Sequence, residues 1–210
     1  MVAGVTCRQA INTHSAITMK RILLVLLLIA VLGGVLAKKF LIFDDETPGL
    51  TALMLVSMAG RTDDARKLIA DGADVNATDA YGNTAVMLAA FHGRTDTVRL
   101  LIEKGANVHA ASSQEEVAGG TALTLAAYKG HTDVARLLID KGANINTADN
   151  EGLTPLMLAA YYGHADTARL LIEQGANVNP ADKNGYTALM YATKGGHTAI
   201  ADMLRAVGAK

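Results

Sequence analysis

The chain has little of what large β-sheet cores and disulfide-bonded domains need. Its 210 residues include no tryptophan, three phenylalanines, six tyrosines, three prolines and a single cysteine. Apolar residues make up 50% of the chain but aromatic residues only 4%, which suits small helices rich in leucine and alanine better than a sandwich of sheets. Because Cys7 is the only thiol, the chain can form neither an internal disulfide nor a zinc site built from cysteine pairs.

The net charge of -1 hides an uneven distribution of charge. Residues 1–43 carry five basic side chains and no acidic one, whereas residues 44–210 carry 14 basic and 20 acidic side chains. Nucleic-acid binding draws most of its affinity from neutralising phosphates, so an acidic body argues against it. The same charge disfavours binding of residues 44–210 to an anionic lipid surface.

Threonine and glycine recur with a common period through the acidic part of the chain. The members of each series are 33, 37, 33 and 33 residues apart. Two independent markers with the same spacing indicate five copies of one structural unit, each of which needs neighbours to bury its apolar face. The threonines are Thr51, Thr84, Thr121, Thr154 and Thr187, and the glycines are Gly72, Gly105, Gly142, Gly175 and Gly208.

The best copy reads Thr-Pro-Leu-x-x-Ala-Ala from Thr154, followed by Gly-His, Leu-Leu-Ile and Gly-Ala-Asn-Val-Asn up to Asn179. This pattern resembles the ankyrin repeat, and the resemblance covers roughly residues 47–210. It implies an all-α solenoid of five helix-turn-helix-loop repeats over residues 51–210. The motif's proline survives only as Pro155, and its histidine is replaced by Met54, Met87, Thr124, Met157 and Met190. We expect each replacement to lose a hydrogen bond in the loop without threatening the fold.

Helix signals within each copy agree with this architecture. The five threonines stand where an N-cap hydroxyl would accept from free amides, and the five glycines suit the left-handed position after a helix. Further threonines are expected to cap the second helices, at Thr62, Thr95, Thr132 and Thr198. Lys67 and Arg205 replace apolar residues of the other copies, which is typical of the polar outer faces of terminal repeats and predicts five repeats and no sixth.

The boundary between the second and third copies contains an irregular loop. The gap of 37 residues places four extra residues within 111–120, between the second and third copies. Insertions in repeat proteins lie in loops, often on the binding face. A tolerated surface insertion without a role explains the sequence as well.

An uninterrupted apolar run over residues 22–37 precedes the repeats, with Lys20 and Arg21 before it. We interpret residues 19–43 as a hydrophobic helix that is either a membrane anchor or a signal peptide cleaved near Ala37. Lys38 and Lys39 directly after such a cleavage site favour the anchor. Residues 1–18 are expected to be a disordered tail or an extension before a true start at Met19, and residues 44–50 a short linker. The charge bias places the repeats outside the cytoplasm, in the periplasm of a bacterial envelope if anchored in the inner membrane.

Candidate catalytic or metal-binding groups do not converge on one point. His131, His164 and His197 recur at the repeat period, and Arg61 and Arg94 fill the same position in the first two copies. Groups one repeat apart lie on successive layers, so we expect a structural role at the turn between helices. No phosphate-binding loop and no Cys/His ligand pairs occur. The sequence therefore predicts a protein that is no enzyme, with no cofactor and no metal.

The resemblance implies that a concave groove and the loop tips bind a partner protein. Large side chains before the inter-helix glycines vary between copies, and aromatic residues are common anchors of interfaces. The alternative that these side chains pack against the neighbouring loop remains open. The predicted groove residues are Met58, Phe91, His92, Tyr128, Lys129, Tyr161, Tyr162 and Lys194, and the predicted residues at the loop tips are Tyr81, Glu151, Lys183 and Tyr186.

The function expected from these observations is protein binding at a cell envelope by a monomer, whose only membrane contact is the N-terminal segment. The partner's identity does not follow from the sequence, because a fold does not define a function. A different class of function is a structural or chaperone-like envelope factor that supports an enzyme without one fixed epitope. Release into the periplasm or the medium after cleavage is the alternative location.

Overall fold

A computed structural model describes residues 49–113 and 119–210. The tail at 1–18, the hydrophobic helix expected over 19–43 and most of the linker at 44–50 lie outside the described residues, as does the centre of the insertion. The described part is helical, with one isolated β-bridge between Ala181 and Thr187. Among these residues, no helix is both long and apolar enough to cross a membrane.

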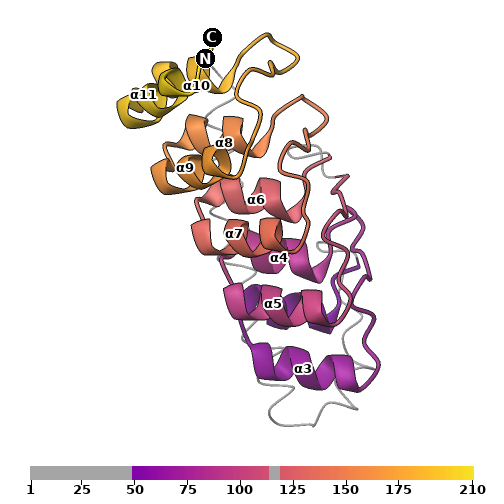
Figure 1. The fold of residues 1–210 in the computed structure, drawn as a ribbon. Coiled ribbons are helices and arrows are strands. Elements are labelled where there is room, and N and C mark those ends of the chain that lie inside the picture. The colour runs from indigo at the N-terminus through magenta and orange to yellow at the C-terminus, as the bar shows by residue number, and fades with distance from the viewer. Residues whose placement is uncertain (1–48, 114–118) are drawn as a thin grey trace. The chain divides into compact units, whose positions relative to one another are not determined.

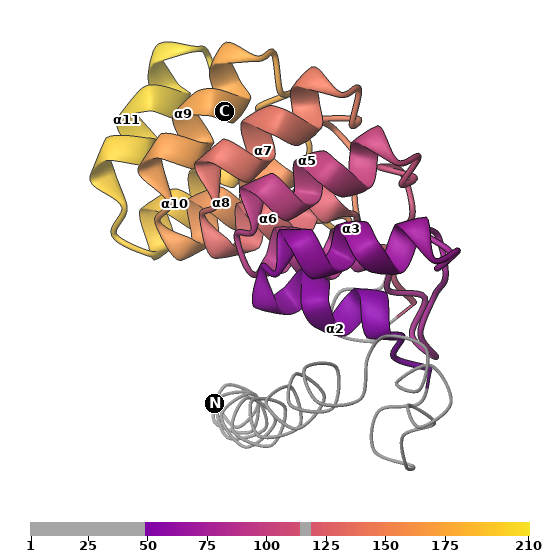
Figure 2. The ribbon, with the colours of Figure 1, turned by 90° about the horizontal axis from the view of Figure 1, so that it is seen from below.

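The described helices come in five pairs, which confirms the all-α repeat architecture expected from the sequence (Figure 1). The first helices of the pairs are α2 (Ala52–Ala59), α4 (Ala85–Phe91), α6 (Ala122–Lys129), α8 (Pro155–Tyr162) and α10 (Ala188–Lys194). The second helices are α3 (Thr62–Ala70), α5 (Thr95–Glu103), α7 (Thr132–Asp140), α9 (Ala165–Glu173) and α11 (Thr198–Ala206). Each helix contacts its counterpart in the next repeat, so the first helices form one layer and the second helices another (Figure 2).

The first helices begin at the threonines that the sequence indicates. Thr51, Thr84, Thr121, Thr154 and Thr187 are all N-caps, and all of them except Thr84 accept a hydrogen bond from the third helical amide. Such a cap satisfies one of the amides that a helix start leaves free. The prediction that the replaced histidine costs a hydrogen bond in every copy is wrong for three copies, whereas Met87 and Met190 complete no capping box. The sulfurs of Met54 and Met157 and the hydroxyl of Thr124 accept from the N-cap amide and complete a capping box.

The prediction that threonines cap the second helices is also wrong, because these helices begin at those threonines, one residue earlier than expected. Their N-caps are Arg61, Arg94, His131, His164 and His197, none of which makes a capping bond with its side chain. The carbonyl at this position accepts the first helical bond, so the following threonine is already helical; Val98 N donates to Arg94 O over 2.8 Å, for example. Two of the displaced threonines link repeats instead: Thr62 bonds Thr97 and Thr132 bonds Thr167, each over 2.8 Å between hydroxyls.

Leucine and alanine fill the core between the two layers. Leu101, Leu138, Leu171 and Leu204 are fully buried at equivalent places in successive second helices. At the two ends of the described stack, Lys67 and Arg205 have side chains that are 78% and 55% exposed, which confirms polar outer faces. Close packing between repeats also needs glycine. A Cβ atom on Gly163 would lie 2.4 Å from the His197 ring of the next repeat.

Hairpin loops join each pair to the next, and all project from one edge of the stack (Figure 1). In three of them an aspartate closes the hairpin, because its carboxylate accepts from the amides two and four residues later; these are Asp79, Asp149 and Asp182. Ser112 takes this place in the irregular loop. Ser112 N donates to Gly120 O over 2.9 Å, so the hairpin closes across eight residues instead of four. The extra residues therefore follow Ser113.

Candidate functional site

Aromatic side chains from four repeats and one hairpin form a connected stripe along the layer of first helices. Phe91 of α4 stacks on Tyr128 of α6 with ring centroids 6.1 Å apart, and Tyr128 meets Tyr162 of α8 edge to face at 4.6 Å. Tyr162 contacts Tyr161 at 4.7 Å. Aromatic pairs at these separations attract beyond their area of contact. The stacking of repeats therefore brings four of the predicted groove residues together, namely Phe91, Tyr128, Tyr161 and Tyr162.

One residue that was not among the predicted site residues extends this stripe. Tyr191 of α10 lies 5.4 Å from Tyr161 and 5.5 Å from Tyr186, and thereby connects the hairpin to the helices. Met190 beside it is 48% exposed. The sequence held a signal for Tyr191, because this position is leucine in the other four copies. We call Phe91, Tyr128, Tyr161, Tyr162, Tyr186 and Tyr191 the aromatic stripe.

Exposure along the aromatic stripe is greatest at α8. Phe91 and Tyr128 are half-buried, so the expected alternative of packing against neighbours applies to them in part. Tyr161 and Tyr162 are 47% and 44% exposed, although Tyr161 contacts two other rings and Tyr162 contacts three. These two tyrosines offer apolar area in a fixed orientation, which is what an interface anchor requires.

Two lysines accompany the rings of the aromatic stripe. The Lys129 ammonium lies 4.5 Å from the ring centroid of Phe91 and 4.9 Å from that of Tyr128. The Lys194 ammonium lies 4.9 Å from the ring centroid of Tyr186. Cation–π attraction holds both charges over the aromatic stripe. In the described part of the chain, no ion pair includes either lysine.

The recurring histidines join repeats. His131 Nε2 bonds Phe91 O over 3.1 Å, His164 Nε2 bonds Tyr128 O over 3.0 Å and His197 Nε2 bonds Tyr161 O over 3.2 Å. Since a carbonyl only accepts, Nε2 is the donor in each case. Arg94 makes the equivalent bond to Met58 O over 3.0 Å. This is the structural role expected at the turn, and no group of three metal-binding side chains occurs among the described residues.

His92 and His131 are held toward their neutral forms. Partial burial lowers the pKa of His92, and the charges of Arg94 and Lys129 lower it further. Burial also lowers the pKa of His131, against the bond to Phe91 O that raises it. The electrostatic potential around His92 and His131 is therefore positive.

At the start of the stack, Met58 is half-buried and its carbonyl accepts a hydrogen bond from Arg94.

The predicted loop tips are only partly joined to the aromatic stripe. Tyr81 is 45% exposed and its carbonyl accepts from Ser113 N over 2.7 Å, but its ring contacts no other ring in the described residues. Glu151 and Lys183 form an exposed ion pair of 3.7 Å, and Lys183 N also donates to Glu151 O. Tyr186 alone belongs to both surfaces. The backbone of the loop tips thus links neighbouring loops, while the side chains at the tips are exposed.

A buried carboxylate anchors the end of the aromatic stripe. The Tyr191 hydroxyl donates to Asp182 Oδ2, and Asp182 Oδ1 accepts from the amides of Asn184 and Tyr186. Burial alone would raise the pKa of Asp182, but these hydrogen bonds outweigh it and lower the pKa. Burial and the neighbouring carboxylate raise the pKa of Tyr191, so the hydroxyl remains a donor. The hairpin therefore fixes the orientation of Tyr191 against Tyr161 and Tyr186.

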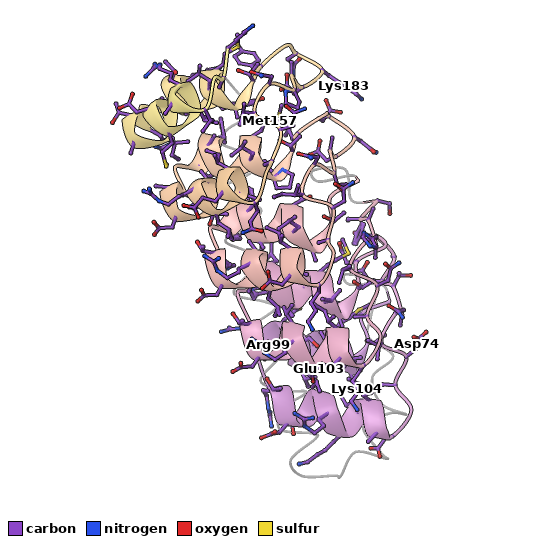
Figure 3. The ribbon with its side chains drawn as sticks, in the orientation of Figure 1. Asp74, Arg99, Glu103, Lys104, Met157 and Lys183 are labelled. Carbon is purple, nitrogen blue, oxygen red and sulfur yellow. The ribbon has the colours of Figure 1, made fainter. Side chains whose placement is uncertain are left out.

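The two helix layers differ in charge. The first helices contain Lys129 and Lys194 as their only charged residues, and they contain no carboxylate. The second helices contain nine carboxylates and six basic side chains. Figure 3 shows Arg99 and Glu103 projecting from α5 in that layer, whereas Lys183 projects from a loop tip. The net negative charge of the described helices thus resides in the layer without the aromatic stripe.

Comparison with protein families agrees with the repeat architecture. A family model described as ankyrin repeats in three copies matches residues 26–112 and 123–210, and a second, for ankyrin repeats in many copies, matches residues 87–139. The first match begins inside the apolar run at 22–37 and leaves a gap between residues 112 and 123, at the irregular loop. A search of curated proteins found no match. Since the matched residues cover most of the sequence, the chain belongs to the ankyrin repeat family.

Proposed function

We propose that this protein binds a partner protein through the aromatic stripe and the adjoining loop tips. Ankyrin repeats are general protein–protein interaction modules and are typically not enzymes. The observation that carries the proposal is that Tyr161 and Tyr162 remain nearly half exposed while ring contacts hold them in place. Rigid, exposed aromatic side chains bind at low entropic cost. The described residues suggest no chemistry beyond surface recognition.

The test is a change of stripe residues with a matched change on the other layer. Tyr128, Tyr161 and Tyr162 are replaced together by alanine in the full chain. The control replaces Arg99, Arg136 and Arg169, exposed residues at one equivalent position of α5, α7 and α9. Cross-linking in the source cells followed by mass spectrometry compares the two variants with the wild type.

We expect the tyrosine variant to lose the specifically cross-linked partner and the arginine variant to keep it. Loss of several interface anchors costs on the order of 2 kcal/mol or more each, enough to abolish detection. Circular dichroism of both variants checks that helicity is retained. A partner that stays bound to the tyrosine variant, or that both variants lose alike, would refute the assignment of the binding surface.

We further propose that residues 19–43 attach this binding module to a bacterial envelope membrane, with the repeats outside the cytoplasm. The sequence alone supports this proposal, through the apolar run at 22–37 and the lysines beside it. The intact mass of the native protein in membrane and soluble fractions tests it. A membrane-bound mass that retains residues 22–37 supports the anchor, and a soluble mass beginning at Lys38 supports cleavage.

A further inference from the structure

The lysines of the aromatic stripe indicate what kind of partner segment would fit it. Lys129 and Lys194 lie at the ends of α6 and α10, and cation–π contacts hold both ammonium groups beside exposed or half-exposed rings. No carboxylate of the described residues pairs with them, and none lies on the first helices. Within the described part of the chain, both charges therefore remain open to a ligand.

The neighbourhood of Lys129 is basic on the side that faces the rings. Lys129 acts on both His92 and His131, and the other charges that act on these two histidines are also basic: Arg94 on both, and His164 on His131. The acidic residues that follow these histidines most closely in the sequence are Asp96, Asp133 and Asp166, in the first turns of the second helices. A ligand that approaches over the first helices meets positive charge before negative charge.

We propose that the aromatic stripe binds an extended, acidic segment of a partner protein, whose carboxylates pair with Lys129 and Lys194. This inference rests on the proposed function and specifies the partner's chemistry. The two lysines are two repeats apart, because α8 packs between α6 and α10. Neighbouring helices lie about 8–10 Å apart, so the span is roughly 18 Å. An extended chain rises about 3.3 Å per residue, which places the two acidic residues about six positions apart with apolar side chains between them.

Charge complementarity favours this occupant over the alternatives. A basic segment would meet unpaired lysines, and like charges in contact are unfavourable. Single-stranded nucleic acid also uses aromatic platforms with lysines, but it needs a basic groove that follows the backbone. Here, acidic first turns border the basic positions, and Glu151 lies at a loop tip. An acidic peptide needs only the two localised charges.

The experiment measures binding of labelled synthetic peptides to the full chain by fluorescence anisotropy. The test peptide has two glutamates about six positions apart with leucines between them. A second peptide has the same composition with the glutamates adjacent, a third has lysines in their place, and an oligothymidylate of similar length is the fourth probe. The variant Lys129→Met with Lys194→Met is compared with the control Lys104→Met with Lys141→Met, exposed C-cap lysines of α5 and α7.

We expect the spaced acidic peptide to bind tighter than every other probe and to weaken as salt is added. The variant Lys129→Met with Lys194→Met is expected to bind this peptide roughly five- to tenfold more weakly. The control variant has the same net charge and should bind it like the wild type. Equal binding of the lysine peptide, or an equal loss in the control variant, overturns the proposal. Tighter binding of the oligothymidylate overturns it in favour of nucleic acid. If the tyrosine variant loses its partner but no peptide preference appears, the proposed function stands and the acidic class is wrong.

Discussion

At the scale of single residues, the environment of a side chain decides its role more than its type does. Six tyrosines occur in the chain, and five of them belong to the aromatic stripe. Tyr161 is exposed, whereas Tyr191 is half-buried and donates to the buried carboxylate of Asp182. The same hydroxyl group is therefore available to a ligand in one case and part of the scaffold in the other.

This difference predicts opposite consequences for two conservative changes. Tyr191→Phe removes the hydroxyl that donates to Asp182, and a hydrogen bond to a charged group contributes about 1.5–3 kcal/mol. We expect the free energy of unfolding to fall by about 1–2 kcal/mol in urea denaturation, because Tyr191 is only half-buried. Tyr161→Phe is the control and should change stability by less than about 0.5 kcal/mol. Equal losses in the two variants would contradict the anchoring role of Asp182.

At the scale of elements, polar links between repeats are unevenly distributed. Asn76 Oδ1 accepts from Asn107 N, Asn146 Oδ1 from Asn177 N and Asn179 Oδ1 from Lys210 N, each reaching into the following segment. His109 stands at this position in the second repeat. At the junction between the second and third repeats, Val134 stands where Thr97 and Thr167 link repeats elsewhere. This junction also carries the irregular loop. In a solenoid, stability depends on such nearest-neighbour interfaces.

The asparagine position therefore predicts a gain of stability. His109→Asn would restore the bond to the backbone amide of Asn144, and we expect a gain of about 0.5–1 kcal/mol. The reverse change, Asn146→His, should remove the bond to Asn177 N and cost a similar amount. Urea denaturation of both variants is the measurement. Shifts of the same sign in the two variants would show that the asparagine bond is not what distinguishes the junctions.

The expected helices and their caps illustrate how far local sequence reasoning extends. The first helices start at the predicted threonines, because an N-cap hydroxyl and the helix that follows are local in sequence. The second helices start one residue away from the prediction. Thr62 and Thr132 are used across the repeat boundary, and a contact with a residue 35 positions away cannot be deduced from cap preferences. The Met54 sulfur was missed for another reason: its bond to the amide of Thr51 is local, but a capping box usually has glutamate or glutamine at this position.

At the scale of the whole stack, basic side chains from three repeats act on one another. Burial first, and then neighbouring positive charges, lowers the pKa of both His92 and His131 below the ordinary value of 6.5. A histidine with a lowered pKa binds fewer protons in the folded state than in the unfolded state. Its contribution to stability is therefore present above pH 6.5 and is lost as the pH falls through the folded-state pKa.

We accordingly expect the melting temperature to fall when the pH is lowered from about 7.5 to about 5.5, where histidines titrate. The double variant His92→Gln and His131→Gln should show a smaller fall, because glutamine carries no titrating group and keeps an amide donor for Phe91 O. Differential scanning calorimetry at the two pH values measures the difference. An unchanged fall in the double variant would assign the pH dependence to other groups.

What the sequence by itself determined is the repeat architecture: the period of threonines and glycines, the five helix pairs, the polar terminal faces and the predicted aromatic positions. Each of these features depends on residues close together in the sequence. Every copy therefore shows the same pattern of helix caps, turns and apolar spacing. Only the tertiary structure decided which side chains meet. Stacking brought Phe91, Tyr128 and Tyr162 into one row, added Tyr191 and through it Tyr186 of a hairpin, and separated Tyr81 from the other rings. The physical reason is that contacts between repeats join residues about 35 positions apart, and their geometry depends on packing between layers rather than on local propensity.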